Sequence, residues 1–354
     1  MMLVAMRTIL DHAAERGYGV PAFNITNMET LQGVMTAAYN SDSPVILQAT
    51  RSARAYMGDV MLRHMLNAVL ETWPTVPVAM HQDHGNNFVT CQTAIDLGFS
   101  SVMMDGSLEE DGKTPASFDY NVRTTASVVG AAHAVGVSVE GELGVLGSLE
   151  TGAAEPEDGH GFEGTLEKHN LVTDPADAAR IEAETEVDAE AIAKRTRHRA
   201  YKFSRKPTNE ILAMETLKEI HRRLPSTHLV MHGASTVPQD LQDMINEFGG
   251  VIPQTFGVPL EEVELGIKYG VRKINIDTDI RMAMTGTIRR HFAEKPASFD
   301  IRGYLKTAAK ATEALCRERY ERFGSAGNGS KIPQITLADM AARYSSGSLA
   351  QRLA

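Results

Sequence analysis

Cysteine is scarce in this sequence, with two residues in 354, Cys91 and Cys316. They lie far apart, which argues against a disulfide framework and favours a reducing, cytoplasmic environment. No apolar run approaches the roughly 18 residues of a membrane span, and the apolar start of the chain is charged too soon for a signal peptide. The net charge is −10 at pH 7, which argues against non-specific nucleic-acid binding, because such binding needs a basic face.

Hydrophobic residues make up 43% of the sequence and charged residues 23%, a balance typical of a globular protein. The length suits one large α/β domain that spans residues 1–354. An anionic substrate stays compatible with the negative net charge, because local basic groups override the average field.

Short apolar runs recur along the chain and are predicted to be strands. There are eight of them: Val20–Asn24, Val45–Thr50, Val78–Asp83, Ser101–Asp105, Ser138–Leu143, Asp188–Ala193, Leu229–His232 and Lys273–Asp277.

Segments with helical periodicity separate most of these runs, for example Met28–Asn40, Asp59–Glu71, Asn87–Leu97, Tyr120–Val135, Asn209–Arg223 and Pro259–Tyr269. Eight strands that alternate with helices predict a TIM (β/α)8 barrel or, failing that, a doubly wound sheet.

Two other segments complete the predicted organisation. Gly144–Asp174 has no clear period and is expected to be a long mobile loop at the active site. Residues 281–354 are expected to form a C-terminal helical extension, with helix over Phe299–Phe323 and a flexible Gly/Ser-rich stretch at Gly324–Ser330.

Polar side chains end nearly every predicted strand. In a barrel the carboxyl ends of the strands meet at one face, where barrel enzymes place their active sites. A single Asp or His at such a position is more often a cap or a loop contact, but recurrence over several strands is hard to explain by capping.

Three histidines fall at or just after strand ends, His84, His198 and His232. Three imidazoles with an open position form a common catalytic zinc site, although spacing alone does not separate this from three unrelated histidines. Asp105 and Glu142 would hold a second cation or orient these histidines, unless they form ordinary salt bridges.

The motifs HGAS (232–235) and NIDTD (275–279) follow the last two predicted strands. This region of a TIM barrel often binds phosphate through backbone N–H groups, although Gly and Ser are also ordinary turn residues. Lys202 adds a positive charge that would meet a phosphate, or it is simply a solvated lysine.

Seven segments in order closely resemble the class II fructose-1,6-bisphosphate aldolases, most of all their Calvin-cycle subtype, over almost the whole chain: HQDHGNN (81–87), SVMMDGS (101–107), VEGELGVLGSLETG (139–152), AYKFSRKP (200–207), LVMHGAS (229–235), PQTFGVP (253–259) and KINIDTDIRMA (273–283). This resemblance implies a lyase of glycolysis, gluconeogenesis and the Calvin cycle, and a homodimer or higher homo-oligomer.

The resemblance also implies residue roles. His84, His198 and His232 match the catalytic zinc ligands, and Asp105 and Glu142 match an accessory site for a second divalent metal. The residues that match substrate-binding or proton-transferring positions are Thr50 (aldehyde contact), Asp83 (proton of the C4 hydroxyl), Glu150 (proton exchange at the ketose carbon), and the dihydroxyacetone-phosphate cradle of Gly233, Ala234, Ser235, Asn275, Ile276, Asp277 and Thr278.

The implied reaction is reversible cleavage of fructose 1,6-bisphosphate, with sedoheptulose 1,7-bisphosphate as a second candidate substrate. Zinc would act as a Lewis acid that stabilises the enediolate, while Asp83 takes the C4-hydroxyl proton. No lysine Schiff base is then needed.

One stretch departs from the family pattern, which usually reads Gly-Thr-Ser-His-Gly before AYKF. Here arginines occupy positions 195, 197 and 199 around His198. The position of Arg199 normally lends its backbone to the substrate phosphate and a neighbouring monovalent cation, so its side chain either supplies phosphate-binding charge or weakens the site. One alternative is therefore an impaired barrel with a binding or assembly role. A separate alternative is a tagatose-bisphosphate aldolase, since the two sugars differ in stereochemistry at C4, which the sequence does not show directly.

Overall fold

The protein is described by a computed structural model over residues 2–111, 114–143, 174–192, 214–224 and 226–349. Eight parallel strands close into a barrel in sequence order. They are β1 (Val20–Asn24), β2 (Val45–Ala49), β3 (Val78–Gly85), β4 (Ser101–Met104), β5 (Ser138–Leu143), β6 (Ala189–Ile192), β7 (His228–Met231) and β8 (Val271–Ile276).

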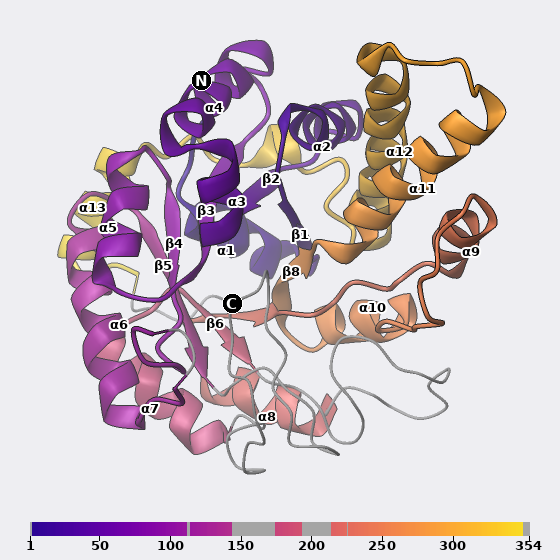
Figure 1. The fold of residues 1–354 in the computed structure, drawn as a ribbon. Helices are drawn as coiled ribbons and strands as arrows, with labels where there is room; N and C mark the ends of the chain where they lie inside the picture. Colours follow the sequence, from indigo (N-terminus) through magenta and orange to yellow (C-terminus); the bar gives the residue numbers. More distant parts are fainter. Residues whose placement is uncertain (1, 112–113, 144–173, 193–213, 225, 350–354) are drawn as a thin grey trace.

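Helices surround these strands, as Figure 1 shows. They are α1 (Met6–Arg16), α2 (Met28–Asn40), α3 (Arg51–Met57), α4 (Asp59–Thr72), α5 (Phe88–Asp96), α6 (Phe118–His133), α7 (Pro175–Thr185), α8 (Met214–Arg223), α9 (Gln239–Glu247), α10 (Leu260–Lys268), α11 (Thr278–Glu294), α12 (Ile301–Arg322) and α13 (Leu337–Ser345), with the 3-10 turn η2 (Gly329–Lys331) before α13. The predicted TIM barrel is confirmed, and the doubly wound alternative is excluded because β1 pairs with β8.

Side-chain caps explain where several helices begin. Asn27 and Thr30 form a capping box at the start of α2, and Asn87 caps α5 by accepting from the N–H of Thr90 at 2.8 Å. Asp174 caps α7, whose first residue is Pro175. Each cap satisfies a backbone donor that the helix itself leaves without a partner.

The core has two layers. Inside the barrel, small and branched residues of alternate strand positions, such as Ala22, Ala79 and Val230, pack with Ile9 and Leu10 of α1. Helix α1 therefore closes the amino-terminal end of the barrel. A larger apolar layer, which includes Phe23, Leu47 and Ile274, lies between the strands and the outer helices.

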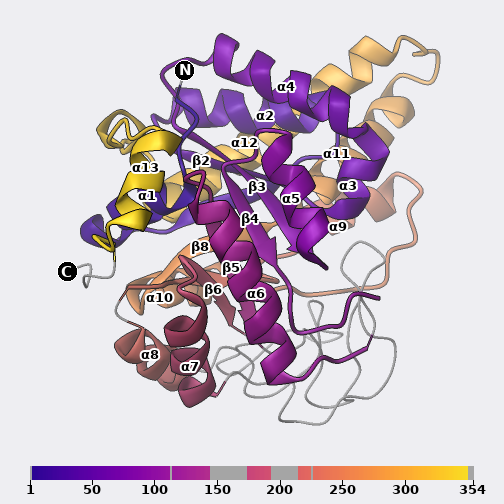
Figure 2. The ribbon, with the colours of Figure 1, turned by 90° about the vertical axis from the view of Figure 1, so that its left-hand side faces the viewer.

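Buried polar contacts fasten the C-terminal helix α13 to this amino-terminal end. Asp188, immediately before β6, accepts hydrogen bonds from Arg7 at 3.0 Å and from the Tyr344 hydroxyl at 2.8 Å. The His133 ring lies 2.9 Å from the same carboxylate and stacks on Tyr344. Figure 2 shows α13 and α1 at the same end of the barrel. Burial alone would raise the pKa of Asp188, but His133 and Arg7 outweigh it and lower that pKa to about 2.

The prediction of a flexible Gly324–Ser330 stretch is wrong. Ser325 is fully buried, and the N–H groups of Gly327 and Gly329 donate to the backbone oxygens of Ser41 and Asp42. The Gly/Ser-rich composition is typical of a flexible loop, but here the backbone N–H groups form hydrogen bonds with carbonyl oxygens at the end of α2. None of the helices within the described ranges is long and apolar enough to cross a membrane.

Candidate active site and metal centre

A bulge at the end of β3 places two consecutive side chains at the barrel mouth. Pairing with β4 shifts register between Gln82 and Gly85, and His84 adopts φ 49°, which is uncommon for a residue other than glycine. Residues 83 and 84 would face opposite ways in a regular strand. Gly85 is required, because a Cβ there would lie 2.5 Å from the Met103 carbonyl oxygen.

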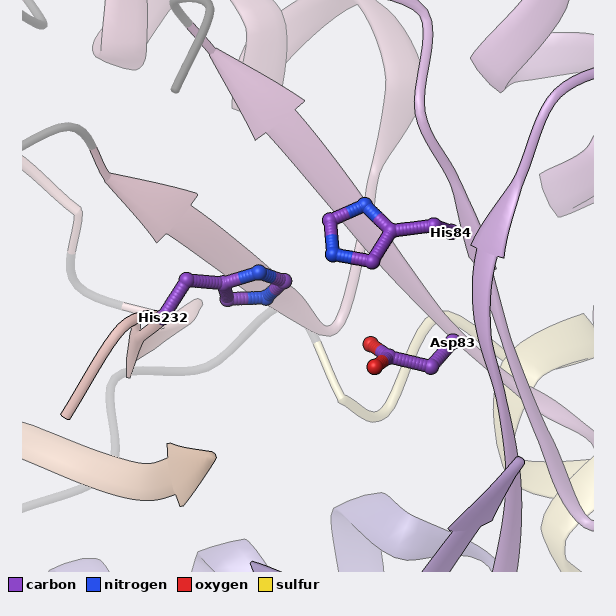
Figure 3. Close-up of side chains that lie close together, drawn as sticks. All are labelled: Asp83, His84 and His232. Atoms are coloured by element: carbon purple, nitrogen blue, oxygen red, sulfur yellow. The ribbon is translucent and has the colours of Figure 1, made fainter. Parts of the chain in front are cut away.

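The bulge brings Asp83 and His84 together with His232, which follows β7. One ligand atom from each of these three residues lies within 4.8 Å of the others. The two imidazole rings are 4.9 Å apart and nearly perpendicular, and Figure 3 shows the Asp83 carboxylate directed toward the space between them. Among the described residues this is the group that satisfies the spacing of a metal site.

The orientation of His232 suits metal binding. Its Nε2 lies 2.8 Å from Glu140 Oε1, so the ring donates from Nε2 and keeps the lone pair on Nδ1. That Nδ1 is buried and makes no hydrogen bond in the described part of the chain; the nearest carboxylate oxygen, on Glu142, is 3.8 Å away. A carboxylate that fixes a histidine in this way is a common support of metal ligands, and two imidazoles with a carboxylate suit zinc.

Glu140 belongs to a buried network inside the barrel. The ammonium of Lys273 lies 2.8 Å from Glu140 Oε2 and 2.8 Å from Asn275 Oδ1, and the Asn275 amide points at Asp83 Oδ1 at 3.5 Å. Burial would raise the pKa of Glu140, but Lys273 and the hydrogen bond from His232 hold it well below its usual range. The network therefore keeps an anion behind His232 and a donor beside Asp83.

His81 completes this network without adding charge. Its Nδ1 lies 2.8 Å from the Ser101 hydroxyl, and its Nε2 is 3.4 Å from Glu140. Burial and the neighbouring Lys273 ammonium hold the pKa of His81 well below its ordinary value. The contact with Glu140 is therefore not an ion pair.

The other predicted metal residues flank the two histidines. Asp105 lies 3.2 Å from His84 Nδ1 and also accepts from the Ser107 N–H and hydroxyl. Burial would raise the pKa of Asp105, but these hydrogen bonds outweigh it and lower that pKa. Glu142 is buried beside His232. Each carboxylate thus borders a different histidine.

The remaining predicted residues lie at the ends of β2, β7 and β8. Thr50 caps α3, where its hydroxyl accepts from the Ala53 N–H at 3.2 Å. Gly233 has φ 59°, and the Ser235 hydroxyl accepts from the Asp277 N–H at 3.3 Å. The side chains of Ala234 and Ile276 pack in the outer apolar layer, which leaves only their backbones for ligand contact; Asn275 faces Asp83 and Thr278 begins α11.

Four predicted site residues, Glu150, His198, Arg199 and Lys202, lie outside the described residues. Two residues of the site were missed, Glu140 and Lys273. The signal was available, since Glu140 and Glu142 alternate in β5 and Lys273 and Asn275 alternate in β8, and a period of two puts each pair on one face of its strand.

A closed (β/α)8 barrel with an imidazole–carboxylate cluster at the carboxyl ends of its strands defines a barrel enzyme with a candidate metal centre. The sequence pattern of the family described as class-II fructose-bisphosphate aldolase matches residues 4–328. The chain belongs to this family, and it is an enzyme of the lyase class.

Two relatives show how far the similarity extends. A fructose-bisphosphate aldolase class 2 from Synechocystis is 60% identical over 349 residues, which cover 99% of this chain and 97% of that protein. A fructose-bisphosphate aldolase 2 from Cereibacter sphaeroides is 60% identical over 354 residues, which cover 100% of this chain and 100% of that protein. Among solved structures, the YdjI aldolase of Escherichia coli superposes with a TM-score of 0.69 at 25% identity, over 93% of this chain and 100% of that one.

Proposed function

We propose that the chain, as a single domain over residues 1–354, reversibly cleaves fructose 1,6-bisphosphate to dihydroxyacetone phosphate and glyceraldehyde 3-phosphate. The observation that carries the proposal is the convergence of Asp83, His84 and His232 at the barrel mouth in a member of this aldolase family. The relatives described above carry the name fructose-bisphosphate aldolase, which favours this sugar over tagatose bisphosphate and over an impaired barrel.

The metal that fits the site is zinc, with His84 and His232 as ligands and His198 as the expected third. When bound, it supplies Lewis-acid stabilisation of the negative charge that develops at the ketone end of the sugar. Glu140 keeps His232 in the tautomer that presents Nδ1. An accessory divalent cation would use Asp105 and Glu142, and a monovalent cation would accompany the phosphate.

Asp83 is proposed as the base of the cleavage direction. Its carboxylate takes the proton of the C4 hydroxyl, and the C3–C4 bond breaks to release the aldehyde. The electron pair of that bond stays on C3, in the half that becomes dihydroxyacetone phosphate, as an enediolate. Proton transfer to C3 completes dihydroxyacetone phosphate, a step assigned to Glu150. Before proton transfer, the Asn275 amide beside Asp83 Oδ1 holds the carboxylate in place.

The two segments after β7 and β8 are proposed to bind the phosphate of the triose half. Gly233 permits close approach of the backbone, Ser235 offers a hydroxyl, and Asp277 and Thr278 open α11, whose amino-terminal N–H groups favour an anion. Arg199 and Lys202 would add positive charge, and Thr50 would contact the aldehyde half.

A coupled cleavage assay on the purified protein tests this function. Fructose 1,6-bisphosphate should be cleaved, EDTA should abolish the activity, and Zn²⁺ should restore it, with bound zinc measured in parallel. Activity that survives complete metal removal would refute the mechanism. The same assay with sedoheptulose and tagatose bisphosphates ranks the alternative sugars, and the mass of the purified protein in solution tests the expected homo-oligomer.

The role of Asp83 has a separate test, because its position also suits a metal ligand. Asp83→Asn should lower kcat by roughly 100- to 10,000-fold, the scale of a lost acid–base group, while zinc stays bound. Loss of zinc from this variant would instead make Asp83 a ligand. His232→Ala, which should lose zinc, is the matched control.

A further inference from the structure

Asp279, in the first turn of α11, holds the segment after β7 in place. Its carboxylate is fully buried and accepts from the Thr236 N–H at 3.1 Å and from the Val237 N–H at 2.9 Å. The Thr236 hydroxyl also donates to it at 3.1 Å. A carboxylate that accepts two consecutive backbone donors fixes the path of that backbone.

The backbone that it fixes is strained. Val237 has φ 49°, a conformation that is an outlier for a β-branched residue and persists only where the surroundings enforce it. Here the hydrogen bond to Asp279 and packing of the Val237 side chain on Ile245 and Met282 enforce it. Strained backbone is concentrated at active sites and ligand-binding segments, so the conformation of Val237 favours a functional role for this segment.

Arg319 of α12 supports Asp279 from behind. Its Nη2 donates to Asp279 at 3.1 Å and to the Thr236 hydroxyl at 2.9 Å, and its side chain is 3% exposed. The buried carboxylate is therefore paired, as a buried charge must be. Asp279, Arg319, Thr236 and Val237 are called the Asp279 clamp below.

The Asp279 clamp joins the two halves of the proposed phosphate site. Thr236 directly follows Ser235, Asp279 directly follows Thr278, and the Ser235 hydroxyl already meets the Asp277 N–H at 3.3 Å. We propose that Asp279, backed by Arg319, is a positioning residue that sets the segment after β7 against the start of α11 and so shapes the site for a triose phosphate. This inference rests on the proposed function.

A positioning role makes a kinetic prediction that a merely structural role does not. If the Asp279 clamp shapes the phosphate site, its loss weakens binding of the phosphate of dihydroxyacetone phosphate in ground state and transition state alike. The KM for dihydroxyacetone phosphate then rises while kcat changes little. The KM for glyceraldehyde 3-phosphate, which binds at the other half of the site, stays the same.

The experiment measures these constants in the condensation direction. Asp279→Asn should raise the KM for dihydroxyacetone phosphate roughly tenfold, the scale of a lost hydrogen bond to a charged group, with kcat within about threefold. Because this variant breaks a buried ion pair and can fold poorly, Thr236→Val gives a milder second test, with a smaller rise in the same KM.

Asp188→Asn is the matched control, since Asp188 is also fully buried and bound to an arginine, but precedes β6 at the opposite end of the barrel. It should lower the melting temperature and leave both KM values unchanged. Equal KM effects in the Asp279 and Asp188 variants, or wild-type KM values in a folded Thr236→Val, would overturn the inference while the aldolase activity of the wild type stands.

Inorganic phosphate gives a readout that does not depend on aldolase activity. Phosphate should raise the melting temperature of the wild type, and Thr236→Val should need a higher phosphate concentration for the same rise. An unchanged phosphate dependence would contradict the role of the clamp. A wild type without aldolase activity but with this phosphate response would instead refute only the proposed function.

Discussion

Glu140 is the single side chain that best explains the geometry of the candidate metal centre. It has no solvent exposure, receives Lys273 and His232 on different oxygens, and thereby fixes which nitrogen of His232 faces Asp83 and His84. A neutral amide at this position would lose the attraction to Lys273 and would no longer impose one tautomer.

Glu140→Gln should therefore weaken zinc binding by about 10- to 100-fold, the usual effect of removing a group that orients a metal ligand. Competition with a coloured chelator measures this affinity directly. Glu190→Gln is the matched control, because Glu190 is also fully buried but lies one strand away on β6. Equal loss of zinc in both variants would contradict the orienting role of Glu140.

Glu190 makes a prediction about pH. Its neighbours Ala189 and Ala191 face the barrel interior, so Glu190 faces the outer helices. Neither of its carboxyl oxygens has a hydrogen-bond partner among the residues that the structure describes. Burial, and then Glu182, raise its pKa well above the ordinary value. The contribution of Glu190 to the free energy of unfolding is therefore fully present below its unfolded pKa of about 4.3. It falls as pH rises toward the folded pKa, by up to about 1.4 kcal/mol per pH unit.

Glu190→Leu should remove this loss, so that its advantage over the wild type in urea unfolding is larger at pH 8 than at pH 5. The substitution Glu247→Leu at an exposed glutamate controls for added apolar surface. An advantage of the same size at both pH values would contradict the prediction. It would show that Glu190 neither binds nor releases a proton on unfolding between pH 5 and pH 8.

The sequence reveals these residues unevenly. His84, His232 and Asp105 stand at strand ends, where barrel geometry alone predicts a site. The alternation of Glu140 with Glu142 in β5 places both on one face of the strand, but the role of Glu140 comes from Lys273 and His232, which are more than 90 residues away in the chain. Asp279 lay inside a motif read as a phosphate site, but its partners Arg319 and Val237 could be found only in the fold.

Among the elements, β3 matters most to the site because of its bulge. Gly85→Ala would bring a Cβ within 2.5 Å of the Met103 carbonyl oxygen and 2.7 Å of Cys91 Sγ, and the backbone at His84 would have to move. We expect weaker zinc binding and a lower melting temperature. Zinc affinity equal to that of the wild type would show that the bulge tolerates the shift.

Gly130→Ala is the matched control for this substitution. Gly130 lies on the exposed side of α6, where an added Cβ meets nothing within 4 Å. Alanine should leave zinc binding unchanged and stabilise the helix by roughly 0.5–1 kcal/mol.

At this scale the apolar runs predicted the eight strands, and two of them, β1 and β5, have the predicted bounds. The prediction ended β3 at Asp83, whereas the strand continues to Gly85, because a bulge depends on pairing with β4 and leaves no mark in one strand alone. Helices α1, α3, α7 and α9 were not among the segments named as helical. For α1 the signal was available, because Met6, Ile9, Leu10 and Ala13 follow the helical period, whereas α3 has only seven residues.

For the whole molecule, the candidate metal centre joins distant parts of the chain. His84 lies near the end of the third strand and His232 follows the seventh, so a bound ion cross-links segments about 150 residues apart. Zinc should raise the free energy of unfolding by about 2.7 kcal/mol at a free concentration 100 times its Kd. Calorimetry with zinc and with EDTA measures the difference, which should vanish in His232→Ala; a zinc effect that persists there would place the ion elsewhere.

The Asp188 contacts at the amino-terminal end have a consequence for synthesis. Arg7 reaches the Leu349 carbonyl oxygen at 2.9 Å across 342 positions and Asp188 across 181. During synthesis Asp188 is made long after Arg7, and Tyr344 and Leu349 are made later still, so Arg7 can meet Asp188 before the contacts with α13 and Leu349 are possible. The contacts that fasten α13 to the amino-terminal end are therefore among the last to form, after β8 has been made and can pair with β1.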